Sequence, residues 1–87
     1  MRNTQLIDLF LNGATEGKGS NLYIDGDVLI NYNTIIAIRE VDGLIILNET
    51  HYSQTTSRHQ NYIKKEHPDN LMLMNDRQLY NHFRLTR

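Results

Sequence analysis

Apolar residues recur at helical spacing near the start of the chain. Leu6, Leu9 and Phe10 lie about one turn apart, so they would share one face of a helix. Gly13 follows, and glycine readily adopts the left-handed conformation that ends helices. The pattern therefore predicts a helix over residues 1–13.

A different pattern follows, in which short β-branched segments alternate with turn residues. Two Asp-Gly pairs, at Asp25 and Asp42, favour tight turns between antiparallel strands. These turns, together with an Asn-rich turn at residues 31–33, separate four segments: residues 22–24, 27–30, 34–40 and 44–47. Residues 21–48 are therefore predicted to form a four-stranded antiparallel β-meander.

The last of these strands is apolar at four consecutive positions, Leu44 to Leu47. Because side chains alternate between the faces of a sheet, only half of them would face a one-sided core. Either both faces are covered, or an apolar patch remains for a partner. We expect a homodimer through this strand or the final helix, with Leu44, Ile46, Tyr80 and Phe83 at the surface of contact.

Helical signals return after the strands. Ser57 and Gln60 fit a capping box, with Thr55 and Thr56 as competing caps, so a helix is predicted over residues 55–67. His59, Tyr62 and Ile63 would face the sheet.

The C-terminal part contains one ambiguous segment and one short helix. Residues 71–74 fit either an edge strand or a packed extended segment, and Asp76 can cap a helix over residues 76–85. The chain as a whole is predicted to be a single α+β domain over residues 1–87. The sheet would be packed by the N-terminal helix, the helix that follows it and the C-terminal helix.

Composition narrows the classes of function. The 87 residues include no cysteine, which excludes disulfides and thiolate metal sites and suits a reducing cytoplasm. No apolar run approaches the ~20 residues that cross a bilayer. We therefore expect a cytoplasmic protein without membrane association, cofactor or bound metal.

Catalytic readings of the hydroxyl-rich segment are weak. His59 beside Ser53, Thr55 or Thr56 could form a hydrolytic site, but such hydroxyls at a helix start are more often caps. We expect Tyr52, Thr55, Ser57 and His59 to be a structural motif, with a buried His59 hydrogen-bonded to Tyr52 or a threonine.

The four histidines are also poor candidates for a metal site. The chain is not expected to bring His51, His59, His67 and His82 together, because Pro68 ends the helix that carries His59 and His51 precedes that helix.

The glycine-rich segment 13–20 does not have the spacing of a phosphate loop, and we expect it to be a flexible connection. The sequence predicts no enzyme.

Three segments between about residues 10 and 63 form a specific pattern: Gly13-x-Thr15-x-Gly17-Lys18-x-Ser20-Asn21-Leu22-Tyr23-Ile24-x-Gly26-Asp27, Ile36-Ala37, and Tyr52-Ser53-x-Thr55-Thr56-Ser57-x-His59-Gln60. In this pattern the chain resembles a family of small uncharacterised proteins of bacterial and archaeal viruses and mobile elements. The resemblance implies a viral or mobile-element origin. Proteins of such origin often occupy host machinery, including CRISPR nucleases, so the expected partner is a host or defence-system protein.

Charge is distributed unevenly between the two halves. Residues 1–50 carry three basic and seven acidic side chains, whereas residues 51–87 carry six and three. The acidic turn residues Asp25, Asp27, Glu40 and Asp42 could mimic nucleic-acid charge against a basic groove. The alternative is a small nucleic-acid-binding regulator that uses Arg58, Lys64, Lys65, Arg77, Arg84 and Arg87.

Overall fold

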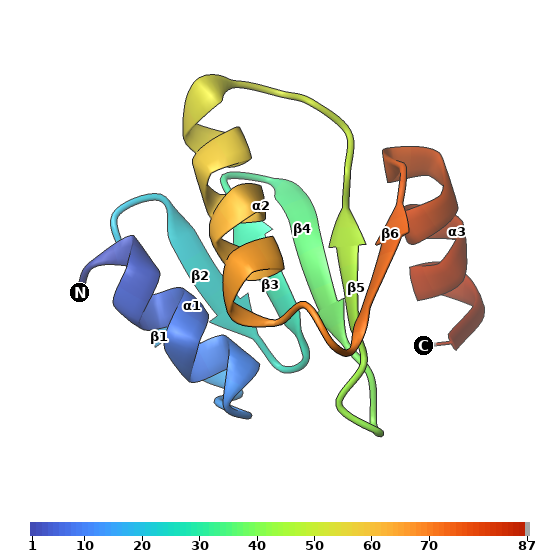
Figure 1. Cartoon of the computed structure of the whole chain (residues 1–87), viewed down its shortest axis with the longest axis horizontal. Helices are drawn as coiled ribbons and strands as arrows, with labels where there is room; N and C mark the ends of the chain where they lie inside the picture. Colours follow the sequence, from blue (N-terminus) through green and yellow to red (C-terminus); the bar gives the residue numbers. More distant parts are fainter. Residues whose placement is uncertain (87) are drawn as a thin grey trace.

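The computed structural model describes residues 1–86 and contains three helices and six strands (Figure 1). Arg87, a member of the predicted basic stripe, lies outside the described residues. The elements in chain order are α1 (Asn3–Leu11), β1 (Glu16–Lys18), β2 (Leu22–Asp25), β3 (Val28–Asn31), β4 (Thr34–Arg39), β5 (Ile45–Asn48), α2 (Gln54–Glu66), β6 (Leu71–Met74) and α3 (Asp76–Thr86).

The strands form one sheet in the order β1-β2-β3-β4-β5-β6. Strands β1 to β5 pair antiparallel with their neighbours in sequence, and β6 pairs parallel to β5 after the chain crosses over through α2. The α+β class and the antiparallel strands β2 to β5 agree with the prediction. The prediction of a sheet with only four strands is wrong, because β1 and β6 extend it at both edges.

Strand β1 occupies the segment that was expected to be a flexible connection. Glu16, Gly17 and Lys18 pair with the three last residues of β2, and Gly26 N–H donates to the Thr15 carbonyl at 2.8 Å. A side chain at Gly17 would place its Cβ only 2.7 Å from Leu6. Glycine here therefore lets the strand approach α1 closely, and flexibility is not its main role.

Helices cover both faces of the sheet (Figure 1). On one face α1 and α2 bury a core that includes Leu6, Phe10 and Ile63. On the other face, Leu79 of α3 packs against a smaller cluster that includes Ile46. Both faces of the apolar strand β5 are therefore covered within one chain, because Ile45, Ile46 and Leu47 are all buried, on alternating faces.

Helix α2 begins earlier than its predicted capping box. Ser53 is the N-cap residue, and its Oγ accepts a hydrogen bond from Thr56 N–H at 3.2 Å. The prediction of Ser57 as cap is wrong, because several hydroxyls compete in this segment and the backbone of Ser53 is the one that is extended. His59 and Ile63 are buried and Tyr62 is partly buried on the face toward the core, as predicted.

Arg39 joins the end of α1 to the turn between β2 and β3. Its guanidinium donates to the carbonyls of Phe10 at 2.5 Å, Ala14 at 3.0 Å and Gly26 at 3.3 Å. The guanidinium also lies 4.9 Å from the centre of the Phe10 ring. A cation suits the C-terminal end of a helix, where carbonyl groups lack partners within the helix.

Candidate functional site

A polar network occupies the end of β5, where α2 and α3 begin. Its centre is Asn48, which is fully buried. The Asn48 amide lies 3.0 Å from the Ile35 carbonyl, the Tyr52 hydroxyl and the Asp76 carboxylate. The network therefore ties β4, the crossover segment and α3 to one side chain.

Helix α2 is fixed to the same end of the sheet by two further polar residues. The Gln60 amide donates to the carbonyls of Asn48 at 2.6 Å and Thr50 at 3.0 Å. The Thr56 hydroxyl donates to the Asn31 side chain at 2.8 Å. These buried groups have the partners that burial of polar atoms requires.

Tyr52, which is exposed, and Asp76, which is partly buried, form the outer rim of this network. The Tyr52 hydroxyl donates to the Asp76 carboxylate, and Asp76 N–H donates to the Thr50 hydroxyl at 2.8 Å. Burial and then the hydrogen bond to Asp76 raise the pKa of Tyr52 to about 12. The phenol is thus a donor at neutral pH and not a base, so the network serves to join elements.

His59 has a different environment from the predicted one. It is 7% exposed, burial lowers its pKa, and none of residues 1–86 is a hydrogen-bond partner of its Nε2. The predicted bond to Tyr52 or a threonine is absent at this atom. The structure places Ser57 instead beside the exposed His51, with 3.0 Å between Oγ and Nδ1.

The pair of His51 and Ser57 places a hydroxyl beside an imidazole, which is one part of a hydrolytic site. A serine nucleophile needs a base and a group that orients the base, preferably in a site that excludes water. His51 is exposed and Ser57 is partly buried, and among residues 1–86 no carboxylate hydrogen-bonds to His51. Thr55, the other hydroxyl of the predicted motif, is exposed.

The acidic turns meet at one end of the sheet. Arg39 N–H donates to the Asp27 carbonyl at 2.7 Å, which brings the β2–β3 turn beside the start of the β4–β5 turn. Asp25 and Asp42 are exposed, and Asp27 is partly buried. We call the carboxylates of Glu16, Asp25, Asp27 and Asp42 the acidic end.

Glu16 belongs to the acidic end although the sequence pattern did not indicate it. It lies directly opposite Asp25 in the β1–β2 pair, and both side chains are exposed. Like charges in directly opposed positions destabilise a sheet. The sequence did not indicate that Glu16 lies opposite Asp25, because strand β1 was not predicted.

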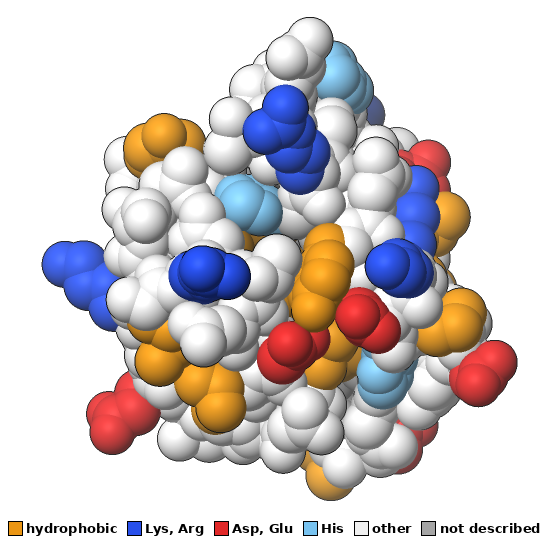
Figure 2. Space-filling view, turned by 60° about the vertical axis from the view of Figure 1, so that its left-hand side comes forward, with side chains coloured by type: hydrophobic (Ala, Val, Ile, Leu, Met, Phe, Trp, Pro, Cys, Tyr) orange, Lys and Arg blue, Asp and Glu red, His pale blue; other side chains and the backbone are white. Residues whose placement is uncertain are grey.

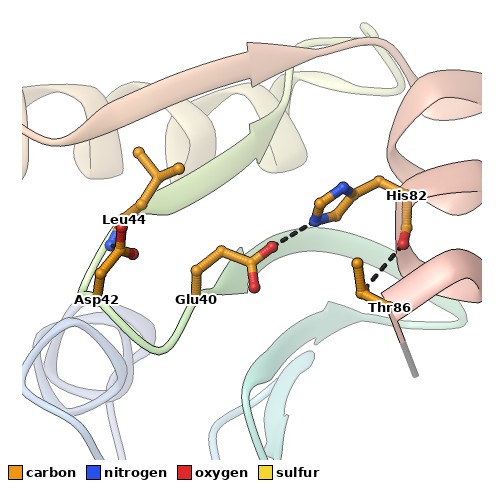
Figure 3. A network of polar contacts seen from close by, with 5 residues as sticks. All are labelled: Glu40, Asp42, Leu44, His82 and Thr86. Carbon is orange, nitrogen blue, oxygen red and sulfur yellow. Dashed lines mark hydrogen bonds and ion pairs between the residues drawn. The ribbon is translucent and has the colours of Figure 1, made fainter.

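Glu40, in contrast, is occupied within the chain. Its carboxylate is paired with His82 of α3, and both side chains are partly buried (Figure 3). Nearby, the Asp42 carboxylate accepts the Leu44 N–H at 3.1 Å and so stabilises its own turn. Among the four acidic residues predicted to bind a partner, Glu40 is therefore already paired within the chain, where it joins α3 to the end of β4.

The predicted basic stripe is divided between two faces of the sheet. Arg58, Lys64 and Lys65 lie on α2, whereas Arg77 and Arg84 lie on α3, which packs on the opposite face. On the face shown in Figure 2, Lys and Arg side chains are scattered among Asp and Glu side chains. The helices do not lie side by side as the nucleic-acid hypothesis required.

The predicted partner surface is largely internal. Ile46 is 1% exposed, and Leu44, Tyr80 and Phe83 pack against the cluster beneath α3. The Tyr80 hydroxyl also accepts the Ile35 N–H at 2.8 Å. Because these residues contact each other within one chain, they leave no surplus apolar surface at Ile46 for a second copy.

Within residues 1–86, no three His, Asp or Glu side chains are grouped so that they could hold a metal ion. In the same part of the chain, no helix has both the length and the apolar character needed to cross a bilayer.

Residues 5–79 match the protein family described as Family of unknown function (DUF8033). No curated protein and no solved structure matches the chain.

Proposed function

We propose that this chain, which belongs to a protein family of unknown function (DUF8033), is a non-catalytic protein that acts by binding another protein through its acidic end. The observation that carries the proposal is the meeting of two acidic turns and β1 at one end of the sheet. Arg39 holds the turns together, and Glu16 and Asp25 face each other there.

The energetics of the acidic end support a binding role. An opposed pair of carboxylates lowers the stability of the sheet, so folding alone does not favour it. A partner with clustered Lys or Arg residues would relieve this repulsion on binding. Such a partner is a protein with a basic groove of the kind that holds nucleic acid.

The sequence resemblance supports the biological setting of this proposal. Residues 10 to 63 resemble small proteins of viruses and mobile elements, and a protein that mimics nucleic-acid charge would suit an effector of that origin. The partner would then be a host or defence-system protein in the cytoplasm, such as a CRISPR nuclease.

The experiment is a binding assay with charge variants at the acidic end. The triple variant Glu16→Gln, Asp25→Asn and Asp42→Asn removes exposed carboxylates and leaves the Glu40 pair with His82 intact. The control, Glu49→Gln, removes an exposed carboxylate beyond the opposite end of β5. Affinity capture from host lysate, followed by mass spectrometry, identifies proteins that the native chain retains.

The expected result is a basic protein that is retained by the native chain and the control but lost with the triple variant. Purified, that protein should bind more weakly as salt rises, because the contact is electrostatic. Equal retention by the triple variant would contradict the acidic end as the binding surface. Retention of nucleic acid, lost when Lys64 and Lys65 are neutralised, would favour the alternative function.

A further inference from the structure

The two edges of the sheet differ in how they are protected from other strands. Edge strand β1 carries Glu16 and Lys18, and charged side chains of this kind discourage strand pairing. Edge strand β6 has the sequence Leu-Met-Leu-Met and no charged residue. Met72 and Leu73 are 45% and 46% exposed, so β6 presents apolar side chains at an open edge.

The backbone of β6 leaves a defined set of groups for a partner. The Asn70 carbonyl accepts a hydrogen bond from Ile45 of β5 at 3.0 Å, and the Met74 carbonyl accepts one from Glu49, the residue after β5, at 2.8 Å. Since successive residues of a strand direct these groups to opposite sides, those of Leu71 and Leu73 point away from β5. The open edge ends at Asn75, whose N–H donates to the Gln78 side chain at 3.1 Å.

We infer that β6 is the dimer interface of this protein, and that β6 of a second copy pairs with it antiparallel about a two-fold axis at Met72. In this register, Leu71 of each copy lies opposite Leu73 of the other copy. Both residues have outward backbone groups, so each such pair exchanges two hydrogen bonds. The two Met72 residues then form the close, non-hydrogen-bonded pair between them.

A second copy suits this edge for two reasons. The arrangement of outward groups, with Leu71 and Leu73 on either side of Met72, is self-complementary under two-fold symmetry, which is the usual symmetry of dimers. The edge also has no charge to repel its own copy. The pairing would join two sheets into one and cover Met72 and Leu73.

The interface is small. Stable interfaces bury about 800 Å² on each partner, which two four-residue strands alone do not reach. We therefore expect the protein to dissociate on dilution and to be dimeric only at high concentration. The inference does not depend on the acidic end, so the triple carboxylate variant should dimerise like the native chain.

Cysteine cross-linking tests the register, because the described chain contains no free cysteine of its own. Residues in a close antiparallel pair have Cα atoms about 4.5 Å apart, which a disulfide can span. Met72→Cys should therefore form a covalent dimer under mild oxidation. Leu73→Cys is the matched control, because the two copies of residue 73 would be separated by more than ~7 Å and should not cross-link.

Sedimentation and amide exchange supply independent measurements. The native 10.2 kDa chain should sediment as a dimer at high concentration, and Leu73→Lys should shift it to monomer, whereas Val41→Lys in an exposed turn should not. The amides of Leu71 and Leu73 should gain protection as the dimer forms, while that of Met72 should be protected throughout. A monomer at all concentrations, or equal cross-linking of both cysteine variants, would overturn the inference.

Discussion

The Tyr52 hydroxyl donates a hydrogen bond to the Asp76 carboxylate across 24 positions of sequence. It thereby joins the segment before α2 to the first residue of α3. The protonated phenol is favoured in the folded chain, where the pKa of Tyr52 is about 12, over the unfolded chain, where a tyrosine has its ordinary value of 10.0. Stability should therefore fall as pH rises from about 10 to 12.

Replacement of Tyr52 by phenylalanine tests this relationship. The Tyr52→Phe variant should lose less stability than the native chain between these pH values, as measured by urea unfolding. It should also lack one of the phenols that ionise late in a spectroscopic titration. An unchanged alkaline profile would show that Tyr52 does not titrate as its contacts indicate.

Tyr62 offers a second phenol whose titration depends on one partner. Its hydroxyl donates to the Asp8 carboxylate at 2.8 Å, and this hydrogen bond is the main cause that raises the pKa of Tyr62 to about 12. Asp8→Asn should bring the pKa down toward 10.0. Asp69→Asn, in an exposed loop, is the control and should leave the titration of Tyr62 unchanged.

Asn48 is expected to be the most sensitive polar residue. Asn48→Ala would leave the Ile35 carbonyl and neighbouring groups without a buried donor, which costs about 1–3 kcal/mol of unfolding free energy. Asn61→Ala, at an exposed position of α2, should change stability little. Chemical denaturation of both variants measures the difference, and equal stability would show that water replaces the Asn48 contacts.

His59 should make the fold sensitive to mild acid. Burial lowers its pKa in the folded chain, whereas the unfolded chain has the ordinary value of 6.5. The unfolded chain therefore takes up the proton first, so the stability is complete above pH 6.5 and declines as pH falls toward the lowered pKa. Thermal unfolding at a series of pH values should show a steeper decline for the native chain than for His59→Leu.

Arg39 should contribute to stability through its planar guanidinium. Arg39→Lys keeps the charge but cannot reach the carbonyls of Phe10, Ala14 and Gly26 together. We expect a loss of about 1–2 kcal/mol, since hydrogen bonds from charged donors are stronger than neutral ones. The control is Arg58→Lys on the exposed face of α2, and equal losses in both variants would contradict the role of Arg39.

Local patterns predicted the hairpins and helices because their signals lie within a few residues. Both Asp-Gly turns have a positive φ angle at their glycine, Gly26 or Gly43, as tight turns require. Strand β1 could not be predicted, because Glu16, Gly17 and Lys18 have no strand propensity and owe their conformation to β2. The parallel placement of β6 likewise depends on the crossover and not on its own residues.

The candidate site was only partly predictable for a similar reason. Turn composition identified Asp25 and Asp42, but no local signal showed that Glu40 would pair with His82, which lies 42 positions away. Ile46, one residue of the predicted partner surface, is buried because α3 covers the face of the sheet on which it lies. Contacts between distant segments decide which side chains remain at the surface.

The parallel placement of β6 has a consequence for the order of folding. Strands β1 to β5 pair with neighbours along the chain, so their association closes only short loops. The pairing of β5 with β6 must instead close the segment of residues 49–70, at a larger entropic cost. The β6 strand should thus join last and leave first, and nascent chains still on the ribosome would hold a nearly complete sheet before it arrives.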